Sequence, residues 1–278
     1  MTSQEQPRKL TGHTDFVKCL LATSLNGKPI LLSAGTDSTI IVWDTTTSTP
    51  LHKIKTPTKA LQDLAIDPLS LEEGDSPSDS LVIFTASSDR EIRRWHISWD
   101  AAFELPESVD IPILAHETSV YKLCFDGEGD LWTASADKTA KHLVRSRGWE
   151  ADTVLAHPDF VRDVVVADER LGLVATACRD EEVRVWDASS GDLVFMYSGH
   201  FEEVTGLALC GGSGLVSISI DGTVRRWSLD RKEMARYREA LEEEKGKSEE
   251  HGETMKKGGG VLTAEEEAEL AELMDEDD

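Results

Sequence analysis

A twelve-residue pattern that recurs five times is the feature that most restricts how this chain can fold. The copies occupy residues 33–44, 85–96, 133–144, 176–187 and 217–228. Each copy begins with Ser or Thr and has Asp at its fifth position, and four of the five have Trp at the eleventh. Successive aspartates are 52, 48, 43 and 41 residues apart. A repeat of this length predicts similar structural units that stack and share a core.

A histidine precedes the pattern in four units, and each is followed by Val four positions later. These histidines are His13, His116, His157 and His200, whereas the second unit has Pro57 where His is expected. Between the markers, β-branched and apolar residues follow a period of two, as at 30–33, 40–43, 173–176 and 183–186. Gly, Asp and Ser bound these runs, so each unit is expected to contain about four short strands.

The order Gly-His, then Ser/Thr-x-x-x-Asp, then Trp-Asp resembles the WD-repeat family. The resemblance covers residues 8–230 and implies an all-β propeller, with blades at 12–55, 56–114, 115–155, 156–198 and 199–230. Residues 7–10 are expected to supply the closing strand of the last blade. Five repeats fit either a closed five-bladed ring or an incomplete larger ring. We favour a propeller made of these five repeats.

The resemblance also implies a buried, hydrogen-bonded tetrad of His, Ser or Thr, Asp and Trp in each blade. The complete sets are His13–Ser33–Asp37–Trp43, His157–Thr176–Asp180–Trp186 and His200–Ser217–Asp221–Trp227. The second blade keeps Thr85, Asp89 and Trp95, and the third keeps His116, Thr133 and Asp137 with Leu143 in place of Trp. Buried polar groups are stable when they are paired, so the two incomplete blades are expected to be locally weaker.

The same residue types occur in Ser-His-Asp catalytic triads, but an enzyme needs one site and this set recurs in several blades. Recurrence at the blade period indicates a structural role. No phosphate-binding glycine loop or nucleophile motif accompanies the set. The cysteines, Cys19, Cys124, Cys178 and Cys210, lack metal-ligand spacing and are interpreted as free thiols of a reducing compartment. We therefore expect no catalysis, no cofactor and no metal site.

The charge of the chain restricts its partners. The 278 residues include 29 Lys and Arg against 53 Asp and Glu, a net charge of −24. Nucleic acids and anionic lipids bind cationic surfaces, so neither is expected as a main ligand. The chain has no apolar run of about 18 residues that would span a membrane, and its N-terminus lacks the apolar segment of a secretory signal. Cytoplasm and nucleus both fit these features.

Residues 231–278 are an acidic tail with 8 Lys and Arg against 17 Asp and Glu, and without Phe, Trp or Ile. This composition cannot form a core, so the tail is expected to be helical or disordered. Met234, Tyr237 and Leu241 predict a short amphipathic helix. A later apolar stripe of Leu270, Leu273 and Met274 fits either a docking helix for a groove with a basic rim or a solubilising acidic end.

The resemblance implies that partners bind the rim where loops enter each first strand and where the middle strands turn. Rim positions with aromatic or cationic side chains are Phe16, Lys18, Tyr121, Phe160, Arg162 and Arg179. Aromatic residues together with Arg are typical of interface hot spots, and we expect them to receive an acidic peptide or protein loop. The sequence thus predicts a non-catalytic scaffold or adaptor. The alternative is a non-catalytic subunit of a larger enzyme complex in ubiquitin handling, RNA modification or chromatin.

Overall fold

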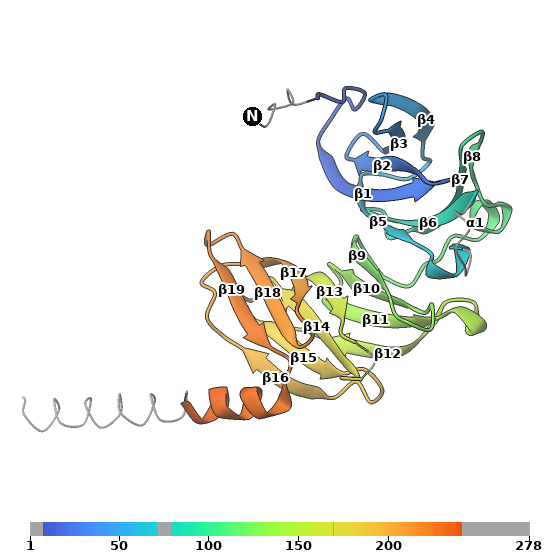
Figure 1. Cartoon of the computed structure of the whole chain (residues 1–278). Coiled ribbons are helices and arrows are strands. Elements are labelled where there is room, and N and C mark those ends of the chain that lie inside the picture. The colour runs from blue at the N-terminus through green and yellow to red at the C-terminus, as the bar shows by residue number, and fades with distance from the viewer. Residues whose placement is uncertain (1–7, 72–78, 169, 241–278) are drawn as a thin grey trace, which may run out of the picture. The chain divides into compact units, whose positions relative to one another are not determined.

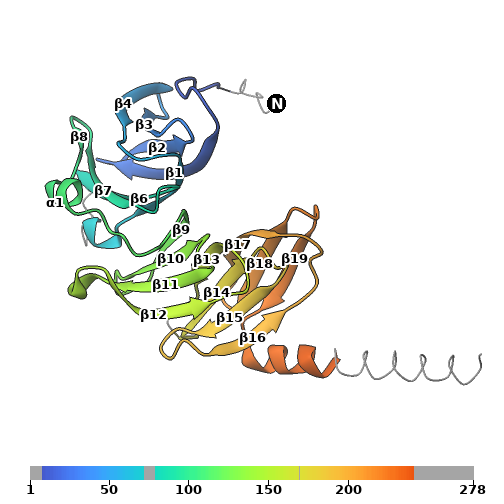
Figure 2. The same cartoon turned by 180° about the vertical axis from the view of Figure 1, so that it is seen from behind.

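A computed structural model describes residues 8–71, 79–168 and 170–240 of the chain. The chain divides into two compact units, Met1–Leu229 and Asp230–Asp278. The first unit consists of five antiparallel sheets whose strands follow one another in chain order (Figures 1 and 2). These sheets confirm the predicted all-β fold with five blades.

The strand bounds follow the repeat closely. The first sheet contains β1 (Val17–Leu25), β2 (Lys28–Gly35), β3 (Thr39–Asp44) and β4 (Thr49–Lys55), and the second β5 (Leu61–Ile66), β6 (Ser80–Ser87), β7 (Ile92–Ser98) and β8 (Ala102–Glu104). The third contains β9 (Val120–Phe125), β10 (Leu131–Ser135), β11 (Thr139–Val144) and β12 (Glu150–Ala156). The fourth contains β13 (Val161–Val166), β14 (Leu173–Cys178), β15 (Val183–Asp187) and β16 (Leu193–Tyr197), and the fifth β17 (Val204–Cys210), β18 (Gly214–Ser219) and β19 (Val224–Ser228). Short helices η1 (Pro68–Ser70), α1 (Pro106–Asp110) and η2 (Arg145–Arg147) lie between strands.

The repeated Asp marks the tight turn between the second and third strands of each blade. The residue that follows it has a positive φ in all five blades: Ser38, Arg90, Lys138, Glu181 and Gly222. The Asp carboxylate accepts a backbone N–H two residues on, as at Asp137 with Thr139 (3.0 Å) and Asp221 with Thr223 (2.7 Å). Asp stabilises such turns through this local hydrogen bond, which is one physical reason for its recurrence.

The core lies between neighbouring blades. One cluster joins the first two sheets around Leu32, Val42 and Trp95, a second joins sheets two and three around Phe84 and Leu123, and a third joins sheets three and four around Trp132 and Val164. A single blade cannot bury both of its faces, so this arrangement is what stacked repeats require.

Two buried carboxylates tie neighbouring first strands together. Asp63 Oδ2 on β5 accepts the Leu123 N–H of β9 at 3.0 Å, and Asp163 Oδ2 on β13 accepts the Leu207 N–H of β17 at 2.7 Å. Lys122 Nζ lies 3.3 Å from Asp63. Burial raises the pKa of Asp163 to about 6, although the Lys122 charge and the Leu207 N–H oppose the rise.

The fifth blade differs from the other four. Its sheet has three strands among the described residues, with β19 outermost. Residues 8–10 belong to no strand, and Arg8 donates instead to the Thr45 and Thr46 carbonyls of the first blade at 3.1 and 3.2 Å. The expectation that residues 7–10 close the last blade is therefore corrected for residues 8–10, because Arg8 bonds to the turn after β3; Pro7 lies outside the described residues.

One face of the fifth sheet is also more exposed than its counterparts. Val224 on β19 is 70% exposed. The residues at the same register position in the other blades, Ile40, Ile92, Ala140 and Val183, are completely buried. In those blades the next blade covers this face, whereas no described residue shields Val224 to the same extent.

The second unit begins with a helix over residues 231–240. The Asp230 carboxylate accepts the N–H groups of Lys232 and Glu233 at 2.8 and 3.2 Å, as an N-cap does. This segment includes Met234 and Tyr237 of the expected amphipathic helix. Leu241 and the stripe of Leu270, Leu273 and Met274 lie outside the described residues.

Candidate partner-binding site

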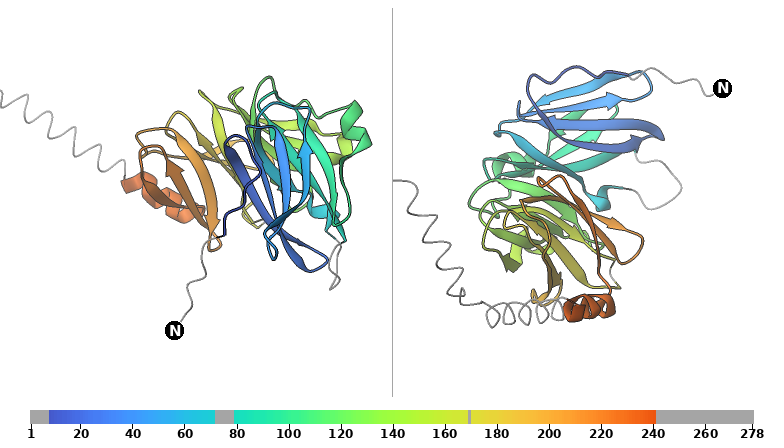
Figure 3. Two further views of the ribbon diagram at one scale, coloured as in Figure 1. Left: turned by 90° about the horizontal axis from the view of Figure 1, so that it is seen from above. Right: turned by 90° about the vertical axis from the view of Figure 1, so that its left-hand side faces the viewer.

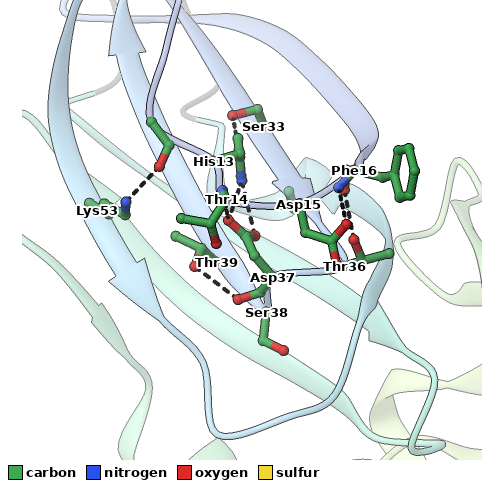
Figure 4. A network of polar contacts seen from close by, with 12 residues as sticks. His13, Thr14, Asp15, Phe16, Ser33, Thr36, Asp37, Ser38, Thr39 and Lys53 are labelled. Carbon is green, nitrogen blue, oxygen red and sulfur yellow. Dashed lines mark hydrogen bonds and ion pairs between the residues drawn. The ribbon is translucent and has the colours of Figure 1, made fainter.

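The first and fifth blades contain complete tetrads. His13 Nδ1 lies 3.0 Å from the Asp37 carboxylate, and its Nε2 lies 2.8 Å from Ser33 Oγ (Figure 4). Trp43 Nε1 donates to the same Ser33 oxygen at 2.8 Å. In the fifth blade the corresponding distances from His200 to Asp221, His200 to Ser217 and Trp227 to Ser217 are 2.9, 2.7 and 2.8 Å.

The tetrad serines lie inside these networks. Ser33 and Ser217 are buried, and each oxygen accepts from Trp while its hydroxyl donates to His Nε2. Burial opposes ionisation of Asp37, but the Thr14 N–H and His13 bind its carboxylate and lower its pKa overall. The tetrad therefore holds the entry loop to the turn between β2 and β3, which is a structural task.

The second and third blades keep partial networks. Trp95 donates to Thr85 at 3.1 Å, and Asp89 binds the Ser87 hydroxyl and the Lys59 N–H in place of a histidine. In the third blade, His116 binds Asp137 at 2.8 Å and Thr133 at 2.7 Å. The Trp position holds Leu143, which is fully buried. An apolar side chain therefore occupies the Trp position in the core, although the hydrogen bond that Trp donates in other blades is lost.

The fourth blade differs from the tetrad that the resemblance implies. His157 Nε2 lies 2.8 Å from Thr176, and Trp186 donates to Thr176 at 2.8 Å. His157 Nδ1, however, donates to the Leu155 carbonyl at 3.0 Å. Asp180 is instead held by Arg184 through bonds of 3.0 and 2.6 Å.

The replacement partner of Asp180 lies beside the tetrad on the third strand. Arg184 occupies the position that Ile41 holds in the first blade, and its guanidinium makes a bidentate pair with the carboxylate. Burial and the nearby Arg184 charge lower the pKa of His157 to about 4, so this histidine is neutral at pH 7.

In the first strand of every blade, a β-bulge leaves one residue unpaired with the second strand. The unpaired residues are Lys18, Gln62, Tyr121, Arg162 and Thr205. Bulges redirect side chains and are frequent beside functional sites. Three of the rim residues chosen from the sequence, Lys18, Tyr121 and Arg162, are therefore bulge residues.

Rim side chains of the third, fourth and fifth blades form one connected group, which we call the rim cluster: Tyr121, Phe160, Arg162, Arg179 and Glu203. The Arg162 guanidinium lies 4.2 Å from the Tyr121 ring centre, and its Nε lies 2.5 Å from a Glu203 oxygen. The Arg179 guanidinium lies 5.3 Å from the Phe160 ring centre and 4.0 Å from the other Glu203 oxygen. Both arginines are thus stacked on an aromatic ring and share one carboxylate.

The other two predicted rim residues lie in the first blade. Phe16 is 77% exposed, with its N–H bound to Asp15, and its carbonyl accepts from Thr36 (Figure 4). Lys18 is exposed at the bulge of β1. Neither residue contacts the rim cluster through a described hydrogen bond, ion pair or ring contact. The structure therefore brings four of the six predicted residues together.

Sequence reasoning counts Glu203 and Ile220 among the rim positions without choosing them as binding residues, and it overlooked Phe201. Glu203 occupies the rim position in the fifth blade that Phe160 has in the fourth. A carboxylate at a rim position, among the cations predicted for this rim, was the signal that could have identified it. Phe201 and Ile220 of the fifth blade are 74% and 63% exposed, and Arg225 lies 5.9 Å from the Phe201 ring centre. Large exposed apolar side chains beside an Arg-aromatic group are typical of an interaction surface.

Other kinds of site have little support in the part of the chain that the structure describes. There, no three His, Cys, Asp or Glu side chains come together as metal ligands do. Within residues 8–71, 79–168 and 170–240, no helix has the length and apolar character needed to span a bilayer. The four cysteines are free thiols.

The family model for the WD domain, G-beta repeat, matches residues 4–44. A WD repeat-containing protein of Schizosaccharomyces pombe, described as uncharacterized, is 36% identical over 271 residues, which are 96% of this chain and 66% of that protein. The chain belongs to the WD-repeat family.

More distant WD-repeat relatives match shorter portions. The nuclear distribution protein nudF of Emericella nidulans is 26% identical over 80% of this chain and 41% of its own length. The F-box/WD repeat-containing protein sel-10 of Caenorhabditis elegans is 30% identical over 40% of this chain and 19% of its own length. The chain thus spans two thirds or less of each of these relatives. WD-repeat proteins generally mediate protein–protein interactions and are typically non-catalytic.

Proposed function

We propose that this WD-repeat chain is a non-catalytic scaffold or adaptor that binds a peptide or protein loop at the rim cluster. The observation that carries the proposal is the pair Arg162 and Arg179, stacked on Tyr121 and Phe160 around the shared Glu203. Arginine on an aromatic face, with apolar side chains nearby, provides both the directional and the apolar contacts of an interface hot spot.

The charges of the rim cluster favour an acidic partner residue next to an apolar one. Arg179 has a side chain that is 51% exposed, and its two ion pairs, to Asp159 and Glu203, are both 4.0 Å long. Exposed pairs of this length contribute little, so Arg179 can exchange them for a shorter bidentate bond to an incoming carboxylate. Phe201 and Ile220 then offer exposed apolar surface to the neighbouring side chain.

The test is partner recovery by a variant in which Arg162 and Arg179 are both changed to Gln, compared with wild type. The matched control changes Arg147 and Arg170, two exposed arginines outside the rim cluster, to Gln. Both variants lose the same charge, so only the position differs. Affinity purification with quantitative mass spectrometry should show partners recovered by wild type and by the control but lost from the rim variant.

The outcome also discriminates between the two kinds of interaction protein. Several partners that depend on the rim support an adaptor, whereas one stable stoichiometric complex supports a subunit of a larger enzyme assembly. If the rim variant recovers every wild-type partner while its melting temperature is unchanged, the rim cluster is not the binding site.

A further inference from the structure

A second candidate surface lies on the segment between the second and third blades. After β8, the chain leaves the edge of β7, forms α1 and returns at Ile113, which pairs with Ile92 through two bonds of 3.0 Å (Figures 1 and 3). The Ser108 hydroxyl accepts the Arg94 N–H at 2.9 Å, and the Leu105 N–H donates to the Arg94 carbonyl at 2.9 Å. The segment is therefore fixed to the sheet by its backbone.

This anchored segment forms one wall of a pocket, and the turn between β11 and β12 of the third blade forms the other. The pocket has a volume of about 670 Å³. Its apolar wall comprises Ile111, Pro112, Ile113 and Leu114, and the opposite side comprises Gly148, Trp149 and Ala151. Ile111 and Leu114 are 76% and 54% exposed, which is unusual for large side chains in one short segment.

Two features of the pocket are energetically costly. Arg94 lines it, and its Nε is buried without a hydrogen-bond partner among the described residues. Trp149 has a φ of 69°, a left-handed conformation that is rare for a bulky residue. Unpaired buried donors and strained backbones of this kind gather at binding sites.

The charges of the pocket select the type of ligand. Its charged residues are the Arg94 guanidinium and the carboxylates of Glu107 and Glu150. Both carboxylates belong to exposed residues, whereas the Arg94 Nε is buried. The mouth is therefore acidic, and the walls are apolar.

We propose that this pocket binds a short segment of a partner protein in which one large apolar side chain is flanked by Lys or Arg. The apolar side chain enters between Ile111, Leu114 and Trp149. The flanking cations face Glu107 and Glu150. This site is separate from the rim cluster, and its ligand has the opposite charge.

The experiment uses the full chain and a panel of fluorescein-labelled pentapeptides. The central residue is Ala, Leu, Ile, Phe or Trp, with two lysines on each side in one series and two glutamates in the other. Fluorescence polarisation at physiological salt should show at least tenfold tighter binding of lysine-flanked peptides with a large apolar centre than of the Ala-centred or glutamate-flanked peptides.

Matched variants locate the binding. Replacing both Ile111 and Leu114 with Ser should weaken the best peptide at least tenfold. Val109→Ser alters another exposed apolar residue of the same segment that does not line the pocket, and should leave binding unchanged.

The proposal is overturned if the lysine-flanked peptides bind equally well whatever their central residue, since that indicates general attraction to an acidic chain. It is equally overturned if the Ile111 and Leu114 variant keeps wild-type affinity. The rim variant at Arg162 and Arg179 should bind the peptides as wild type does, so failure of one site is distinguishable from failure of the other.

Discussion

Arg184, not His157, is the partner of Asp180 in the fourth blade. The guanidinium contacts both carboxylate oxygens, at 3.0 and 2.6 Å, and its side chain is 9% exposed. His157 keeps its bond to Thr176 and satisfies its other nitrogen with the Leu155 carbonyl. The fourth blade therefore has two separate polar pairs where the first and fifth blades have one continuous network.

Asp180→Ala should destabilise the protein by about 2–4 kcal/mol, because it leaves the buried Arg184 charge without its partner. A double-mutant cycle separates the two candidate partners. The coupling energy between Asp180 and Arg184 should exceed about 1 kcal/mol, and that between Asp180 and His157 should be within about 0.5 kcal/mol of zero. Chemical denaturation supplies both values, and the reverse order would show that the histidine is the true partner.

The sequence predicted the blades well because each carries local markers. The Asp turn and the β-branched runs act within a few residues of one another, so their spacing reveals five sheets. The choice between His157 and Arg184 is different. It depends on which side chain reaches the Asp180 carboxylate across neighbouring strands. Arg184, at the position that Ile41 holds in the first blade, does not alter the spacing of the tetrad residues, so the pattern does not reveal it.

Stability at mildly acidic pH should report this arrangement. The pKa of His157 is lowered to about 4 by burial and by Arg184, whereas an unfolded histidine titrates near 6.5. The unfolded state therefore takes up a proton first, and the contribution of this residue to stability is lost as pH falls from about 6.5 to 4.

Arg184→Ile, which introduces the residue of the first blade, should raise the pKa of His157 by removing the nearby cation. Nuclear magnetic resonance titration of the His157 ring protons measures the change. Arg184→Lys retains a positive charge and serves as the control, with a His157 pKa that stays low. An unshifted His157 in the Ile variant would mean that burial alone sets its pKa.

Asp163 should produce the opposite pH dependence. Its pKa is raised by burial to about 6, so above that pH the carboxylate is ionised in both states and its burial destabilises the folded state. The penalty is relieved as pH falls through 6 toward the unfolded value near 4. Asp163→Asn keeps an acceptor for the Leu207 N–H and removes the charge. The variant should be more stable than wild type by about 2–3 kcal/mol at pH 7.5, and the difference should vanish near pH 4.

The candidate site depends on strand register and on contacts between blades, which the sequence pattern does not reveal. Tyr121 and Arg162 could be chosen because their positions follow a histidine at a fixed distance. That they project from β-bulges depends on strand register, which the spacing does not reveal. Glu203 was overlooked as the shared partner of two arginines because that contact joins side chains of different blades. The pocket beside α1 likewise depends on how residues 105–113 dock on β7.

Gly35 should control how the first blade presents Phe16. The same register position holds Ser87, Ser135, Cys178 and Ser219 in the other blades. A Cβ at Gly35 would lie 2.2 Å from the Phe16 carbonyl oxygen, which is far inside van der Waals contact.

Gly35→Ser should therefore displace the entry loop, break the 2.9 Å bond from the Thr36 N–H to Phe16, and cost about 2 kcal/mol or more. Ser219→Ala is the control, because it removes the two hydrogen bonds of that hydroxyl, to the Glu202 carbonyl and from the Asp221 N–H, without adding a side chain to the loop, and should cost about 1–2 kcal/mol. Hydrogen exchange at Thr36 should accelerate in the Gly35 variant by more than global destabilisation explains. Unchanged protection of that amide would show that the loop tolerates a side chain at this position.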